Sequence, residues 1–170
     1  APRADDALVI VSDALSRRPR QRDFLPYFVA WARAAADSLH QAERLVRVAV
    51  FCIDELGYEA AAREYFEEAL GLDAGQPTAL VRLADIAWAS RDDERALQLL
   101  DRMPPEMWAS APTEDGRPRA VAELLMRRAR CAWSLGHADT RERLRQVLRV
   151  NARYVPCLLY TSDAADEEDS

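Results

Sequence analysis

The sequence predicts an all-α fold, a solenoid of antiparallel helix hairpins. Apolar residues recur three and four positions apart along most of the chain, as they do on one face of a helix. Val, Ile and Thr are sparse outside these patterns, which argues against a β architecture. One helix pattern also returns after 34 residues, with Ala62, Phe66 and Ala69 followed by Ala96, Leu100 and Met103. Such a period is typical of repeat units made of two helices.

The first 42 residues are expected to form a pair of helices that diverges from the repeats. An apolar stripe predicts the first helix over 5–17. The second helix is predicted over 24–39, because Asp23 can cap it and Pro26 lies in its first turn. At that position the missing N–H of proline has no cost.

A hairpin is predicted next. Ser38 and Gln41 have the spacing of a capping box, so the third helix is predicted over 41–56, with Gly57 ending it. The fourth helix follows almost at once, over 58–72. Because the connection is so short, the two helices must be antiparallel neighbours.

The repeats are predicted to cover 43–156. Pro77 opens the fifth helix, over 77–90, at a position that favours proline. The sixth helix is predicted over 92–103 and stops at Pro104.

An insertion is expected near 104–118, between two repeat units. The counterparts of Leu100 and Met103 are Leu144 and Val147, which lie 44 positions later instead of 34. The seventh and eighth helices are predicted over 119–135 and 138–150.

The last residues differ in composition from the rest. Residues 157–167 resemble the translation of a sequencing adapter, and we expect 157–170 to be a non-native, disordered tail. The natural sequence is then expected to stop near Pro156, and the absence of an initial Met indicates a fragment at both ends. The remainder is rich in Ala, Arg, Leu and Val and has no Lys, which suggests a bacterial origin.

The tail also changes the charge. The full chain has 23 basic and 29 acidic residues, a net charge of −6. Five acids lie in 157–170, so the remainder has 23 against 24, or −1. A nearly neutral chain gives no support for a polyanionic partner.

Compartment signals are weak. No run of 18 apolar residues occurs, so no membrane span and no membrane partner is predicted. Cys52 and Cys131 lie within apolar helical patterns, and we expect them to be buried, reduced thiols. Reduced thiols favour a cytoplasmic location.

No catalytic or metal-binding arrangement stands out, so the chain is predicted not to be an enzyme and to hold no metal or cofactor. His40 and His137 lack a ligand partner at metal spacing. The adjacent acids Glu67 and Glu68 are better explained as a solvated helix face than as a general acid–base pair. The run 92–94 is interpreted in the same way.

Nucleic acid is a weaker candidate partner. A basic cluster contains Arg127, Arg128, Arg130, Arg141, Arg143, Arg145 and Arg149, with Trp133 nearby. A stacking surface for single strands combines such residues. However, Glu123 and Glu142 interrupt the cluster, and the chain is nearly neutral without its tail.

The repeated positions resemble the tetratricopeptide repeat. That signature places a small residue on the first helix, glycine at the turn, and Ala, a large aromatic residue and Ala on the second helix. The resemblance implies a right-handed α-solenoid whose packing positions are Gly57, Ala62, Phe66, Ala69, Ala84, Ala96, Leu100, Ala129, Gly136 and Leu144. Three positions depart from the signature. Ala74 replaces the closing Pro, Arg91 the turn Gly, and Thr140 the second-helix Ala.

The resemblance also implies a function. In this family a partner peptide lies in the concave groove lined by the first helix of each unit. The matching positions here are Arg44, Arg47, Phe51, Arg82, Asp85, Trp88, Arg127, Arg130 and Trp133. Arg and Trp suit an acidic or C-terminal peptide with an apolar anchor. For the two Trp residues, burial between units is the competing interpretation.

The sequence therefore predicts a non-catalytic scaffold or adaptor that binds another protein or peptide, with self-association as a further possibility. The chain has no Lys, so the family's chaperone-binding mode, which holds a terminal carboxylate with Asn and Lys, is not expected. Two alternatives stay open. One is a regulatory domain of a larger bacterial protein such as a transcription regulator, and the other is a helical accessory domain of an enzyme.

Overall fold

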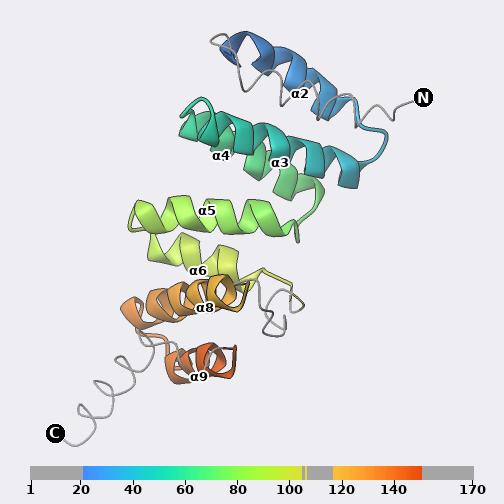
Figure 1. Ribbon diagram of the computed structural model, residues 1–170. Helices are drawn as coiled ribbons and strands as arrows, with labels where there is room; N and C mark the ends of the chain where they lie inside the picture. Colours follow the sequence, from blue (N-terminus) through green and yellow to red (C-terminus); the bar gives the residue numbers. More distant parts are fainter. Residues whose placement is uncertain (1–20, 105, 107–116, 151–170) are drawn as a thin grey trace, which may run out of the picture. The chain divides into compact units, whose positions relative to one another are not determined.

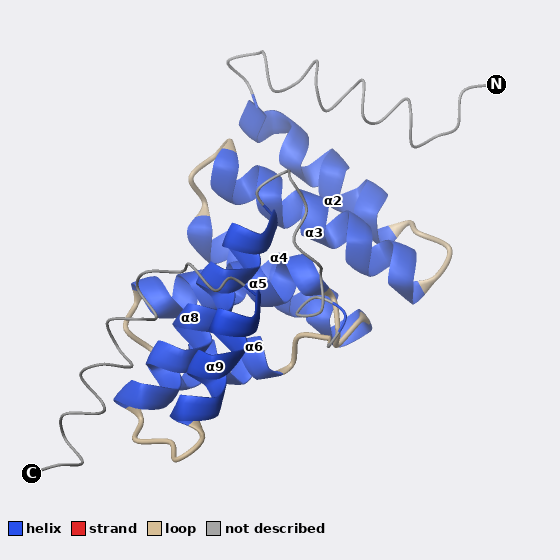
Figure 2. Cartoon of the chain, turned by 60° about the horizontal axis from the view of Figure 1, so that its bottom comes forward, coloured by secondary structure: helices blue, strands red, loops and turns tan. Residues whose placement is uncertain are grey.

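The computed structural model describes residues 21–104, 106 and 117–150, and every regular element in that part of the chain is a helix (Figures 1 and 2). The contacts divide the chain into two compact units, with the boundary between Ala79 and Leu80. The predicted helix over 5–17, most of the predicted insertion and the segment 157–170 lie outside the described residues.

The first unit is built around one helix hairpin. Its elements are a short 3-10 helix η1 (Gln21–Phe24) and the helices α2 (Leu25–Arg33), α3 (Ser38–Asp54) and α4 (Glu59–Leu72). The helices α3 and α4 are in extensive contact, and α2 packs against α3. Gly57 has a φ of +68°, which allows the chain to reverse within the short connection between α3 and α4.

The predicted boundary between the second and third helices is wrong. The helix α2 ends at Arg33 instead of Leu39, and α3 begins at Ser38 instead of Gln41. The physical reason is the cap, because the carboxylate of Asp37 accepts a hydrogen bond from the backbone N–H of His40 at 2.9 Å. The side chain of His40 also contacts this cap, because its Nδ1 lies 2.6 Å from the second carboxylate oxygen of Asp37.

That pair also shifts two pKa values. The backbone and side-chain hydrogen bonds from His40 lower the pKa of Asp37. The hydrogen bond to Asp37 and the charge of its carboxylate raise the pKa of His40.

The start of α2 also differs from the prediction, but by less. Phe24 is the N-cap residue and makes no side-chain cap bond, so Asp23 does not cap the helix. Pro26 lies in the first turn, as predicted.

The second unit contains two further pairs of helices. The helix α5 (Pro77–Ala89) crosses the unit boundary near its start, and it is followed by α6 (Asp93–Asp101), α8 (Arg117–Ser134) and α9 (Thr140–Val150). The side chain of Asp92 caps α6 by accepting a hydrogen bond from the N–H of Arg95 at 3.0 Å. The helix α8 packs against both α6 and α9.

The turns after α5 and α8 have the same geometry but different residues. After α8, Gly136 has a φ of +72°, and the N–H of His137 bonds the carbonyl of Ala132 at 2.9 Å. After α5, Arg91 has a φ of +62°, and the N–H of Asp92 bonds the carbonyl of Ala87 at 2.9 Å. Both are Schellman turns, in which the left-handed position normally favours glycine. Arg91 thus takes the glycine conformation without being glycine.

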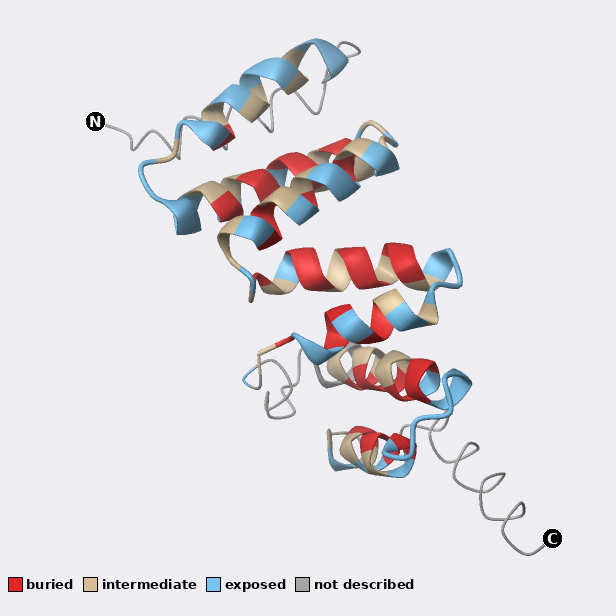
Figure 3. Ribbon diagram, turned by 180° about the vertical axis from the view of Figure 1, so that it is seen from behind, coloured by how far each residue is buried: buried red, intermediate tan, exposed pale blue. Residues whose placement is uncertain are grey.

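The repeated positions lie in the core. Figure 3 shows the buried residues of the helices in red. Ala62, Phe66 and Ala69 are 0 % exposed, and Ala96 and Leu100 are no more than 1 % exposed. Full burial of a side chain as large as Phe66 contributes about 2–3 kcal/mol. The other apolar packing positions, Ala84, Ala129 and Leu144, are also buried.

Two of the remaining predictions concern the core. Cys52 and Cys131 are buried free thiols, as predicted. Thr140, expected as a substitute for the second-helix Ala, is buried at the first position of α9, where its hydroxyl donates to the carbonyl of His137 at 2.6 Å. The predicted fold class, an all-α helical repeat, is confirmed.

Candidate partner-binding surface

Two side-chain pairs connect α5 to α8 in the second unit. Nη1 of Arg127 on α8 donates to Oδ1 of Asp85 on α5. One turn further along both helices, the guanidinium of Arg130 lies 5.1 Å from the ring centre of Trp88. All four residues were predicted to contribute to partner binding, and the structure brings them together. Asp85 and Arg127 keep side-chain exposures of 39 % and 38 %, so a ligand can still reach them.

These pairs fix the side chains that a partner would meet. An ion pair between half-exposed groups adds little to stability. A guanidinium over an indole ring contributes about 0.5–1 kcal/mol at an exposed site. Each pair therefore contributes little to the stability of the fold, and its main effect is to hold the arginine in one orientation. Less conformational entropy is then lost when a ligand binds.

Two further predicted residues continue the same rows. Arg82 lies one turn before Asp85 on α5 and is partly buried, whereas Trp133 lies one turn after Arg130 on α8 and is 38 % exposed. Trp88 differs from Trp133, because it packs against a core cluster that contains Ala87, Leu97 and Cys131. We name the set Arg82, Asp85, Trp88, Arg127, Arg130 and Trp133 the α5–α8 surface.

The three predicted residues of the first unit are arranged differently. The guanidinium of Arg44 lies 4.6 Å from the ring centre of Trp31 on α2 and donates to the carbonyl of Trp31 at 3.2 Å. Phe51 meets Phe28 of α2 edge to face at 5.6 Å. Of the three, only Arg47 is exposed, and Arg44 and Phe51 are partly buried. Two of the three side chains thus contribute to the packing of α2 on α3.

Sequence reasoning missed an ion cluster around Asp101, at the end of α6. Its carboxylate accepts hydrogen bonds from Arg128 of α8 and Arg143 of α9. Burial opposes ionisation of Asp101, but the hydrogen bonds from the two arginines outweigh it and lower the pKa of the carboxyl. One signal was available: Arg143 lies 44 positions after the apolar Leu99, so it occupies a core position of its repeat.

The described residues offer little for chemistry. Burial raises the pKa of both Cys52 and Cys131 to about 11, so neither thiol is ionised near neutral pH. Within the described ranges, no group of three His, Cys, Asp or Glu side chains could hold a metal ion. In the same part of the chain, no helix is long and apolar enough to cross a membrane.

Comparison with known families finds a match for part of the chain. Residues 58–107, which include α4, α5 and α6, match the family described as Tetratricopeptide repeat. This segment is similar to the tetratricopeptide repeat. No curated protein and no solved structure was found to match the chain. Tetratricopeptide repeats are typically non-catalytic scaffolds, so the repeat indicates a general role in protein–protein interaction.

Proposed function

We propose that the chain is a non-catalytic adaptor that binds an extended segment of a partner protein on the α5–α8 surface. The observation that carries this proposal is the paired arrangement of Arg127 with Asp85 and of Arg130 with Trp88. Arginine and tryptophan are the residues that most often dominate binding energy at protein interfaces. Here both types are held in place by neighbours and remain within reach of solvent.

The chemistry of the surface favours an acidic ligand with an apolar anchor. The set contains three arginines and one aspartate, so its net charge is positive. Guanidinium groups bind carboxylates with two parallel hydrogen bonds. The half-exposed ring of Trp133 offers a flat apolar area for the anchor. The ligand would be a segment with an acidic residue next to a bulky apolar one.

The experiment is a selection of peptides from a random library on the full chain. Calorimetry then gives the Kd of the selected peptides for the protein and its variants. We expect Trp133→Ala and Arg82→Glu each to weaken binding at least tenfold, which corresponds to about 1.4 kcal/mol. The matched control is Arg63→Glu, an equal charge reversal at an exposed position on α4. Equal affinities for all three variants would refute the proposed site.

The two buried thiols favour a reducing compartment, and we place the protein in the cytoplasm on that basis. Cys52 and Cys131 are each 0 % exposed and form no disulfide. Buried thiols of this kind are protected only while the fold is intact. Labelling of protein recovered from its native cells, after denaturation, would show two reactive thiols at these positions. Oxidised thiols would contradict the placement.

A further inference from the structure

We propose a second binding surface, on the exposed face of α9, that takes an amphipathic helix of a partner carrying acidic residues. Arg141, Arg145 and Arg149 are all exposed and follow one another at intervals of four. This spacing places them on one face of the helix. The site differs from the α5–α8 surface because its three arginines all belong to α9.

Two of the three arginines share one carboxylate of the same helix. Arg145 and Arg149 both pair with Glu142, at 3.5 Å and 3.1 Å. Their side chains are 66 % and 67 % exposed in spite of these contacts. One carboxylate therefore serves two guanidinium groups, and exposed pairs of this kind are weak enough to be replaced by those of a ligand.

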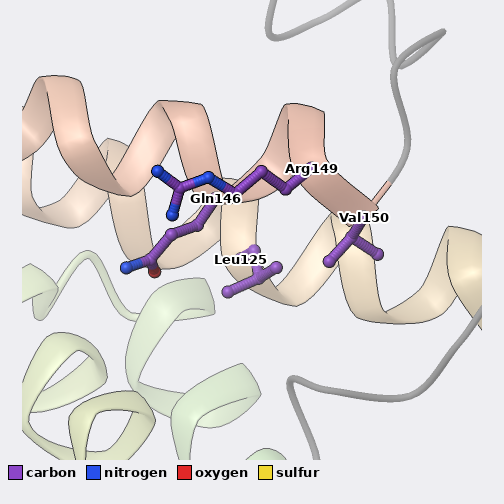
Figure 4. Close-up of a pocket in the computed structure, with 4 residues that line it drawn as sticks. All are labelled: Leu125, Gln146, Arg149 and Val150. Carbon is purple, nitrogen blue, oxygen red and sulfur yellow. The ribbon is translucent and has the colours of Figure 1, made fainter.

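An apolar hollow lies beside the arginines. Figure 4 shows the four side chains that line it, with Leu125 coming from α8 and Gln146, Arg149 and Val150 from α9. The side chain of Arg149 runs along α9 toward Gln146 (Figure 4). A ligand helix can place an apolar side chain in the hollow and an acidic one against Arg149.

A comparison of α9 with α6 indicates how such a helix would lie. The two helices correspond at a separation of 44 residues, as shown by the buried pairs Leu100 with Leu144 and Met103 with Val147. The helix α8 packs on α6. At that contact Arg128 bonds Asp101, and Leu97 lies in one core cluster with Cys131 and Ala132.

The corresponding positions on α9 have the opposite character. Arg145 corresponds to Asp101, and Arg141 corresponds to Leu97. A helix that packed on α9 as α8 packs on α6 would meet a positive charge where α8 meets a negative one. It would therefore need an acid in place of Arg128 and a second acid near the position of Ala132. Charge complementarity thus selects an acidic helix and disfavours a basic one.

The test uses two synthetic helical peptides with the sequence of residues 117–134, both with C131A to prevent oxidation. The first is otherwise unchanged. The second carries R128E and A132E, which place acids opposite Arg145 and Arg141. Binding of each labelled peptide to the full chain is measured by fluorescence anisotropy. We expect the acidic peptide to bind at least tenfold more tightly than the unchanged one.

Charge reversal on the protein gives the decisive comparison. The variant Arg145→Glu should lose affinity for the acidic peptide and gain affinity for the unchanged peptide, which keeps Arg128. Arg63→Glu on α4 serves as the control and should change neither. An order of affinities that does not respond to the charge at position 145 would overturn the proposal. Binding of an oligonucleotide that Arg145→Glu abolishes, with neither peptide bound, would overturn it in favour of a nucleic-acid site.

Discussion

Arg143 on α9 and Asp101 at the end of α6 form a doubly hydrogen-bonded ion pair across 42 positions of sequence. Nη1 donates to Oδ1 at 2.6 Å and Nη2 donates to Oδ2 at 3.2 Å. Arg143 is only 9 % exposed, and its Nε donates to Asp139 at 2.9 Å. Because Asp101 also accepts from Arg128, one carboxylate connects α6 to both α8 and α9.

Asp101→Asn should destabilise the protein, since it removes the charge and leaves Arg143 buried beside a neutral amide. We expect a loss of about 1–2 kcal/mol in the free energy of unfolding, because hydrogen bonds to charged groups are strong while partial exposure weakens them. Urea unfolding of the full chain measures it. Arg145→Gln, which breaks an exposed pair, should cost less than about 0.5 kcal/mol. Equal unfolding midpoints for the two variants would contradict the role of Asp101.

Acid should remove the contribution of Asp101 to the free energy of unfolding. The pKa of Asp101 is lowered in the folded state from its ordinary value of 3.8. The ionised carboxylate therefore stabilises the fold above pH 3.8, and this stabilisation is lost as the pH falls through the lower, folded-state pKa. The stability difference between wild type and Asp101→Asn should be full well above pH 3.8 and should shrink as the pH falls below that value. A difference that stays constant over this range would show that the charge is not responsible.

Arg91→Gly should stabilise the protein. Arg91 is exposed and holds a φ of +62°, a conformation that L side chains adopt at a cost. Glycine removes that cost but makes the unfolded chain more flexible, so we expect a net gain of about 0.5–1 kcal/mol. Gly136→Ala is the converse substitution, because it adds a side chain at a glycine that holds the same backbone conformation. An added Cβ there meets nothing within 4 Å, so its loss of about 1 kcal/mol would come from the backbone alone. A destabilised Arg91→Gly protein would be inconsistent with the turn geometry.

Ala62→Leu tests the packing of the hairpin in the first unit. Ala62 is 0 % exposed on α4, and overpacking at such a position costs about 1–3 kcal/mol. Ala60→Leu is the matched control, because Ala60 lies two positions away on the same helix and is exposed. Thermal unfolding should show a clear fall in Tm for Ala62→Leu and almost none for Ala60→Leu. A similar Tm for both would mean that the crossing is not tightly packed.

Local signals predicted most of the fold. Gly57 and Gly136 mark helix ends because glycine adopts the left-handed conformation at no steric cost. Pro77 marks a helix start because its fixed φ suits the first helical position. The boundary at Asp37 was missed for a local reason. Ser38 and Asp37 both suit an N-cap, and the additional bond between Asp37 and His40 decides between them. Such competition cannot be resolved from residue spacing alone.

Contacts between helices were less predictable than the helices themselves. The family signature placed Asp85, Trp88, Arg127 and Arg130 on the first helices of their units. It did not predict that Arg127 would bond Asp85. That pairing depends on the register in which α5 and α8 lie. The insertion before α8 changes the repeat period, so sequence spacing does not give this register. The bonds of Asp101 escaped prediction for the same reason, since they span 27 and 42 positions.

Hydrogen–deuterium exchange of the full chain, with and without a peptide selected from the library, tests partner binding on the α5–α8 surface most directly. The measurement follows backbone amides along every helix, so it locates the ligand without any substitution. We predict slower exchange over residues 82–88 and 127–133 when the peptide is bound, with α4 unchanged. Protection confined to α3 and α4, or no protection in α5 and α8, would contradict the proposed surface.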